Sequence, residues 1–366
     1  MIKDRVVQWV LRHTDVPPVG VDISDRSIKY MRIAQGRPVA IEAFGEIEIP
    51  EGVMVSGEIL REEEMIGLLR DLVRREHACF RGGGIVASLP EEKSFLRSLR
   101  LENVKSQDIG DAIRWEIEAQ IPLPVENIIY DYDVVPGSPA ESRSINAVLT
   151  AFPKALVESY VRMFTSAGMP LAAMELESQA TVRALVSDFE TSPARVIVDM
   201  GRTRTSFILL AAGEIIFTTT IAIGGHALEE SIGTVLGVGP EEAARMKKEV
   251  GLAKNASEGK IFSALIPTVG ALADELQRTI QSYQNHLVHE PGAHGDIVEI
   301  LLSGGDANLS GLDTYLASVA RIPCRRADSF EALRFHIGDA IPPIAYRESL
   351  GYATAIGLAL RGMHRS

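Results

Sequence analysis

Residues 196–216 read VIVDMGRTRTSFILLAAGEII, and this stretch decides the fold because the chain uses its pattern twice. An apolar strand ends at Asp199, a polar turn follows, a second apolar strand comes next, and Gly213 closes a hairpin. Residues 19–39, VGVDISDRSIKYMRIAQGRPV, repeat this order, and aligning Asp22 with Asp199 places Gly36 on Gly213 without a gap. Two matching hairpins indicate an internal duplication.

Each hairpin has the chemistry of a phosphate-binding turn. A run such as Val-Ile-Val-Asp is typical of a buried strand that delivers one carboxylate to the end of a sheet. The turns offer backbone N–H groups and hydroxyls without bulk, which suits phosphate oxygens. We therefore expect the hairpins to clamp a polyphosphate, with Asp22 and Asp199 near one Mg²⁺ ion that keeps part of its water shell. The predicted phosphate-binding residues are Ser24, Ser27 and Lys29 in the first hairpin and Gly201, Thr203 and Thr205 in the second.

A third ligand-binding segment is expected near residues 300–312, ILLSGGDANLSGL. A strand, the pair Gly304-Gly305 and a helix N-terminus let a ligand approach the backbone and direct amide dipoles toward it. On a helix predicted over residues 260–287, Glu275 and Arg278 lie within one turn of each other and are candidates to face a ribose or a base. Such a pair is more often a surface ion pair.

A carboxylate that could orient water is expected where a predicted strand, residues 171–176, meets a predicted helix, residues 178–186. Glu175 and Glu177 lie at this junction. One of them is placed to face the phosphates and to position an attacking water.

Length, charge and cysteine content exclude several classes of protein. The 366 residues exceed one ordinary core and should form two or more lobes. The formal net charge of −12, from 37 basic and 49 acidic side chains, argues against a nucleic-acid groove. Cys79 and Cys324 are the two cysteines, and they support neither a disulfide framework nor a zinc site. No apolar run approaches the roughly 20 residues that cross a bilayer, and no signal peptide opens the chain, so we expect a cytoplasmic protein.

Together these segments resemble the actin-like ATPase superfamily, which includes actin, Hsp70, sugar kinases, MreB and FtsA. Five segments in the superfamily's order span nearly the whole chain: the two hairpins, a connecting glutamate identified here with Glu177, an adenosine motif at residues 300–312, and a small-residue helix, YATAIGLAL, at residues 352–360. The resemblance implies an α/β fold of duplicated ribonuclease H-like domains with ATP and Mg²⁺ between them, and Gly304 and Gly305 under the adenosine. If hydrolysis occurs, Glu177 is the candidate to orient water, and Asp22 or Asp199 to hold magnesium.

Within the superfamily, residues 88–135 and 151–178 resemble the PilM family of type IV pilus assembly proteins. The segments AIRWEIEAQIPLP, residues 112–124, and IIYDYDVV, residues 128–135, are the most specific parts. The resemblance implies four subdomains: 1A over residues 1–90, 154–195 and 346–366, an FtsA- and PilM-type 1C insertion over 91–153, 2A over 196–238 and 296–345, and 2B over 239–295.

The same resemblance implies a scaffold at the cytoplasmic face of the inner membrane. It would dock the N-terminal cytoplasmic peptide of a PilN-like inner-membrane protein between 1A and 1C, and reach the membrane only through that partner. Nucleotide would act as a conformational switch, with ATP hydrolysis slow or absent. Contact with the pilus motor ATPases and self-association are left open.

Two other functions within the superfamily stay open as alternatives. One is an FtsA- or MreB-like protein that forms ATP-dependent filaments in cell division or cell shape. The other is a small-molecule kinase, against which the lack of an evident base for a sugar hydroxyl counts. Two departures bear on these alternatives: Ser24 stands where many members have glycine, and nothing after Gly362 resembles the membrane-targeting tail of FtsA.

Overall fold

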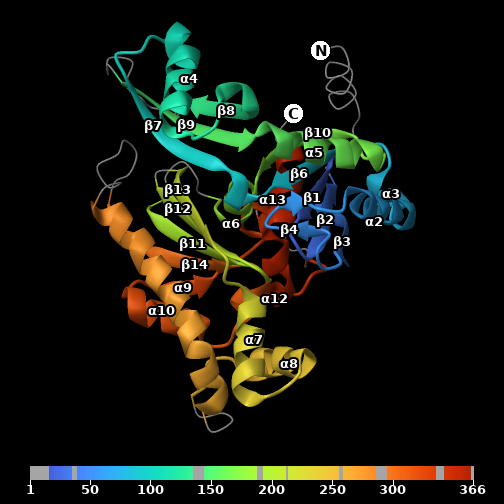
Figure 1. Ribbon diagram of the computed structural model, residues 1–366, viewed down its shortest axis with the longest axis vertical. Coiled ribbons are helices and arrows are strands. Elements are labelled where there is room, and N and C mark those ends of the chain that lie inside the picture. The colour runs from blue at the N-terminus through green and yellow to red at the C-terminus, as the bar shows by residue number, and fades with distance from the viewer. Residues whose placement is uncertain are drawn as a thin grey trace.

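In a computed structural model, the described residues form three sheets of three or more strands, with helices around them (Figure 1). The structure describes residues 16–34, 39–134, 144–187, 193–211, 213–254, 259–285, 295–334 and 342–363. Gly36, predicted to close the first hairpin, lies outside these residues. Within them, no helix combines the length and the apolar character that a membrane span needs.

Two five-stranded sheets repeat one strand order. The first runs β3-β2-β1-β6-β10 and the second β13-β12-β11-β14-β15. In each, an antiparallel three-stranded meander is extended by two parallel strands. The duplication predicted from the hairpins therefore extends to whole sheets. The strand bounds are β1 Val19–Ile23, β2 Ser27–Ala34, β3 Ala40–Glu48, β6 Ile85–Leu89, β10 Leu171–Leu176, β11 Arg195–Met200, β12 Thr205–Ala211, β13 Glu214–Ile221, β14 Glu299–Ser303 and β15 Cys324–Arg326.

The two hairpins also share one register. Asp22 pairs with Lys29, and Asp199 pairs with Ser206, the same number of residues later in each case. Every residue of β12 is buried, as expected for a strand covered on both faces. The acidic residue is thus carried to the end of a buried strand in both halves, as the sequence pattern predicts.

Helices pack on both sheets, and α6 and α13 lie near the centre of the molecule (Figure 1). At Gly357 of α13 a Cβ atom would lie 1.8 Å from the carbonyl oxygen of Ala180 in α6, so the small-residue helix packs directly on its neighbour. The helix bounds are α2 Glu62–Arg75, α3 His77–Phe80, α4 Ile109–Gln120, α5 Lys154–Ser166, α6 Glu177–Leu185, α7 Gly225–Leu236, α8 Pro240–Val250, α9 Lys260–Asn285, α10 Leu312–Ala320, α12 Tyr346–Ser349 and α13 Ala353–Met363.

The insertion predicted over residues 91–153 contains a third sheet, of order β7-β9-β8, with α4 packed on one face. The strands are β7 Phe95–Glu102, β8 Ile128–Val134 and β9 Ser144–Pro153. The two faces of β9 have different surroundings, because successive side chains of a strand point to opposite faces. Its residues Ala147, Leu149 and Ala151 enter the core beneath α4, whereas Val148, Thr150 and Phe152 line a cavity on the other face.

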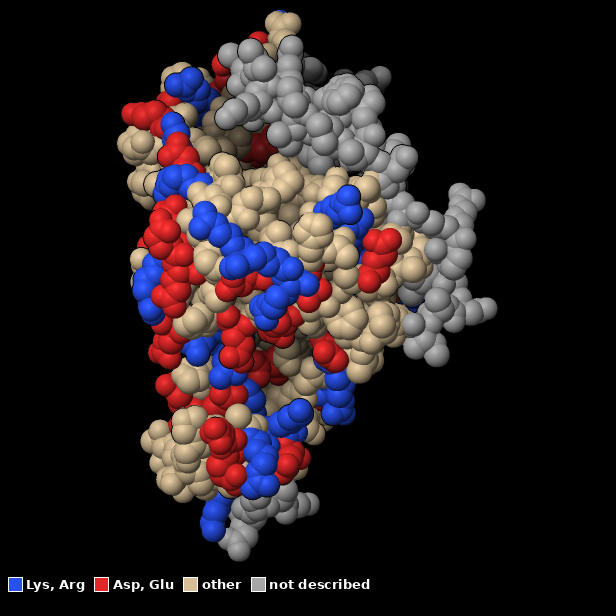
Figure 2. Space-filling model, turned by 90° about the vertical axis from the view of Figure 1, so that its right-hand side faces the viewer, with Lys and Arg blue, Asp and Glu red and all other residues tan. Residues whose placement is uncertain are grey.

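Smaller elements connect these layers. The strands β4 Met54–Val55 and β5 Glu58–Ile59 form a two-stranded ribbon, and a one-turn helix, η1 Glu91–Lys93, leads into the insertion. On the face drawn in Figure 2, Lys and Arg side chains lie among Asp and Glu side chains. That face accordingly carries mixed charge rather than a field of one sign.

Candidate functional site

A cleft of about 680 Å³ lies where the two hairpin turns meet. Its volume is within the range of small-molecule sites, roughly 300–1,000 Å³. Segments distant in the chain supply its walls: both turns, the start of α6, the double glycine and residues 347–354. The predicted site residues that line it are Asp22, Ser24, Ser27, Lys29, Glu177, Asp199, Gly201, Thr203, Gly304 and Gly305.

The two turns are closed by equivalent hydrogen bonds. The N–H of Ser24 donates to the carbonyl of Ser27, and the N–H of Gly201 donates to the carbonyl of Arg204, both at 2.9 Å. Ser24 is not among the residues with positive φ, so this turn does not require the glycine that many superfamily members have there. Its hydroxyl also donates to the Ser27 carbonyl at 3.2 Å, which stabilises the turn.

Thr205 lies outside the cleft, although the sequence places it among the phosphate-binding residues. Its side chain is fully buried, and the hydroxyl donates to the Ile223 carbonyl at 2.6 Å. The physical reason is strand alternation: Thr205 is the first residue of β12 and already points into the protein.

Asp22 and Asp199 lie close enough to raise each other's energy when both are ionised. Burial raises the pKa of Asp22, and Lys29 beside it opposes the shift. Burial, together with the charge of Asp22, raises the pKa of Asp199 to about 6. A divalent cation between the two carboxylates would remove this repulsion, so the residues fit the predicted Mg²⁺.

In each half, a serine on the neighbouring parallel strand lies beside the aspartate. The Ser88 hydroxyl donates to Asp22 at 2.9 Å, and the register places Ser303 beside Asp199. Neither serine is among the site residues predicted from the sequence. Extending the alignment of the two halves to IVAS, residues 85–88, and ILLS, residues 300–303, would have found them.

Arg204 is a third residue that sequence reasoning missed. It is 12% exposed and forms ion pairs at 2.8 Å with both Glu92 of η1 and Glu177 of α6, and a longer one, 3.6 Å, with Asp25. Burial raises the pKa of Glu177 well above its usual range, and Arg204 opposes that shift. The predicted water-orienting carboxylate is therefore held by an arginine of the second hairpin.

Gly304 adopts a left-handed backbone, with φ of +88°. A Cβ atom there would lie 2.3 Å from the Met200 carbonyl oxygen and 2.8 Å from an oxygen of Asp199. A side chain at this position would therefore collide with the end of β11, and glycine is required. A Cβ atom at Gly305 would meet nothing within 4 Å, so the backbone there is open to a ligand.

Charged residues beside the double glycine come from α7 and α8. Lys247 of α8 donates to Asp306, a cleft residue, at 2.6 Å and to Glu229 of α7 at 2.7 Å. Glu275 and Arg278, predicted near the ribose or base, do not line the cleft. They lie on α9, paired with each other at 3.2 Å, and the Arg278 side chain is 68% exposed. The spacing on α9 pairs the two side chains with each other, outside the lining of the cleft.

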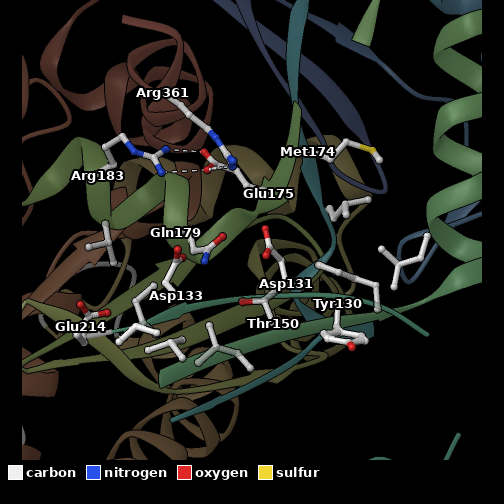
Figure 3. A pocket seen from close by; sticks show the side chains of 18 of the residues that line it. Tyr130, Asp131, Asp133, Thr150, Met174, Glu175, Gln179, Arg183, Glu214 and Arg361 are labelled. Atoms are coloured by element: carbon white, nitrogen blue, oxygen red, sulfur yellow. Dashed lines mark hydrogen bonds and ion pairs between the residues drawn. The ribbon is translucent and has the colours of Figure 1, made fainter. Parts of the chain in front are cut away.

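A second cavity of about 1050 Å³ separates the insertion from α6 (Figure 3). Residues of β8 and β9 form one wall, and residues of β10, α6 and the start of β13 form the other. Its apolar lining includes Ile129, Val148, Phe152, Met174 and Val182. Glu175 lies at one edge, where Arg183 donates to it at 2.9 Å and Arg361 also binds it. We call this cavity the groove.

The duplicated sheets and the cleft between their hairpins define a protein with the actin-like ATPase fold. A solved structure of MreB5 of Spiroplasma citri bound to ADP has a TM-score of 0.54 with this chain, at 15% identity, over 88% of this chain and 94% of that chain. A stretch of 124 residues, 33% of this chain, is 27% identical to cell division protein FtsA of Bacillus subtilis (strain 168) and spans 28% of that protein's length.

A family match over nearly the whole chain gives a narrower assignment. The sequence profile of the family described as type IV pilus assembly protein PilM matches residues 20–363, and the chain belongs to that family. A solved PilM-PilN type IV pilus biogenesis complex has a TM-score of 0.80 with this chain, covering 96% of it and 100% of that chain at 21% identity. The predicted fold and family are both confirmed.

Proposed function

We propose that this protein is an ATP-binding scaffold of the type IV pilus assembly platform, and that it docks the N-terminal cytoplasmic peptide of a PilN-like inner-membrane protein. The observation that carries the proposal is the groove between the insertion and α6, in a chain of the PilM family. Docking would recruit the protein to the cytoplasmic face of the inner membrane.

The groove has the features of a peptide site. Ile129 of β8 is 41% exposed and lies beside an apolar floor, so the groove presents hydrophobic surface to an incoming segment. Polar groups among the lining residues, such as Thr150 and Gln179, can fix the orientation of that segment. An apolar groove with a few polar groups suits a short peptide that becomes ordered on binding.

The cleft supports the nucleotide part of the proposal. Asp22 and Asp199 would hold Mg²⁺, which when bound neutralises phosphate charge, and the hairpin turns would bind the phosphates. The open backbone at Gly305 would approach the adenosine. Because Arg204 holds Glu177 in an ion pair, we expect ATP hydrolysis to be slow or absent.

Two paired helices connect the cleft with the groove, which supports a nucleotide-dependent switch. In α6, Glu177 lines the cleft and Arg183 lines the groove. In α13, Thr354 lines the cleft and Arg361 lines the groove. The hydroxyls of Thr181 and Thr354 lie 3.0 Å apart in a hydrogen bond that joins the helices. A shift of α6 on nucleotide binding would therefore reach the groove.

Titration calorimetry tests the docking with a synthetic peptide of the PilN-like protein's N-terminal cytoplasmic segment, in the presence of ATP and Mg²⁺. We expect one-to-one binding that Ile129→Glu weakens at least about tenfold, because a charge would enter the apolar part of the groove. Val161→Glu is the matched control, since Val161 is 39% exposed on α5 and lies outside the groove lining.

Equal loss in both variants, or no binding by the unchanged protein, would contradict peptide docking. If the unchanged protein does not bind the peptide and sediments as filaments in the presence of ATP, the FtsA- and MreB-like alternative would be favoured. ATP consumption stimulated by a small acceptor would favour a kinase.

A further inference from the structure

Three carboxylates line one side of the groove. Asp131 and Asp133 alternate with Tyr130 and Tyr132 along β8, so they share the face that also carries Ile129. Glu214, the first residue of β13, joins them from the second large sheet. Figure 3 shows these three side chains across the cavity from the cluster of Glu175 with its two arginines.

The charges of the groove are unbalanced. Its lining contains four carboxylates and two guanidinium groups, and both guanidinium groups bind the same carboxylate, Glu175. Within the part of the chain that the structure describes, Asp131, Asp133 and Glu214 form no ion pair. The N–H of Tyr132 donates to Asp131 at 2.9 Å, which leaves its negative charge in place. The acidic side of the groove therefore lacks a cation from the described residues.

Repulsion between neighbouring carboxylates makes a cation more favourable on the acidic side of the groove. Burial raises the pKa of Glu214, and the charge of Asp133 raises it further, so these two carboxylates lie close enough to repel. A positive group between them would gain attraction to both and relieve their repulsion. No cluster of three or more His, Cys, Asp or Glu side chains among the described residues is arranged to hold a metal ion, so an organic cation fits better.

We propose that Asp131, Asp133 and Glu214 form a subsite for a cationic group of the docked peptide, a lysine ammonium, an arginine guanidinium or the amino terminus. Apolar side chains of the same peptide occupy the floor beside Ile129 and Phe152. This inference rests on the proposed docking of a peptide in the groove, and it adds the charge that the peptide must carry. The acidic subsite sets the register of the peptide, while the apolar floor supplies most of the affinity.

The test uses the same synthetic peptide and a double variant, Asp133→Asn with Glu214→Gln, which keeps the shape of both side chains. We expect about tenfold weaker binding at low salt and a smaller loss at high salt, because the lost attraction is electrostatic. Asp111→Asn is the matched control, since Asp111 is an exposed α4 residue outside the groove lining, and it should bind the peptide as the unchanged protein does.

Peptides neutralised at one position each identify the bound cation: lysine replaced by norleucine, arginine by citrulline, or the amino terminus acetylated. One neutralisation should weaken binding to the unchanged protein and have no further effect on the double variant. Unchanged affinity of the double variant, or additive losses for every neutralised peptide, would overturn the subsite while docking stands on the Ile129→Glu result. No binding of the peptide to the unchanged protein would overturn both.

Discussion

Asp22 and Asp199 oppose folding of the nucleotide-free chain while they prepare it for Mg²⁺. The pKa of Asp199 rises from an ordinary value of 3.8 to about 6 in the folded chain, chiefly through burial. Between these values the folded state binds more protons than the unfolded state, so stability falls as the pH rises from about 4 to 6 and stays reduced above that window.

We therefore expect Asp199→Asn to raise the free energy of unfolding of the nucleotide-free chain by about 2 kcal/mol at pH 7.5, with the difference vanishing near pH 4. The same change should abolish the stabilisation that Mg²⁺ with ATP gives the unchanged protein. Urea unfolding at the two pH values measures both effects. A variant that is less stable than the unchanged protein at pH 7.5 would contradict this assignment.

Two helices that cover the first large sheet, α6 and α13, pack at short distance, and glycine makes this possible. The α6 and α13 helices meet at Gly357, where any side chain would overlap the Ala180 carbonyl. Residues of the same two helices line both the cleft and the groove. Under the proposed nucleotide switch, this close packing would connect the two sites as well as fill the core.

Gly357→Ala should destabilise the protein by about 2–3 kcal/mol, because α13 must move away from α6 to admit a methyl group. Gly67→Ala, in α2, is the control: a Cβ atom there meets nothing within 4 Å, and the change should be neutral or stabilising by up to about 1 kcal/mol. Chemical unfolding of both variants provides the measurement. Similar stability of the two variants would show that the helices can separate without loss.

At the scale of the whole molecule, the cleft and the groove are two sites with one set of helices between them. If nucleotide and peptide each favour one arrangement of α6 and α13, their affinities must be linked, and the linkage must be reciprocal. The chain belongs to the PilM family of type IV pilus assembly proteins. Linkage between its nucleotide and peptide affinities is part of the proposed function.

We expect ATP with Mg²⁺ to change the dissociation constant of the peptide about fivefold or more, and the peptide to change that of ATP by the same factor. Calorimetric titrations in both orders measure the two factors. Asp22→Ala should lose nucleotide binding and keep the peptide affinity of the nucleotide-free protein. Equal peptide affinity with and without ATP would show that the two sites are independent.

The sequence by itself determined the features that local chemistry encodes. An apolar run that ends in aspartate before a small polar turn specifies a buried hairpin, and the ungapped repeat of that pattern predicted two equivalent hairpins. The double glycine was predictable because Gly304 needs a backbone that other residues rarely adopt. The insertion carried enough specific sequence, including residues 112–124, to indicate the family.

Only the tertiary structure decided which charges meet. Arg204 and Glu92 are 112 residues apart, and Lys247 meets Asp306 across 59 residues, so no local pattern could pair them. Glu275 and Arg278 had the right spacing on one helix, but they pair with each other on α9 and are not among the residues that line the cleft. Periodicity reports which face of an element is apolar, whereas the neighbours of its polar face depend on how distant elements pack. The groove and its acidic side arise in the same way, from segments that adjoin only in the folded chain.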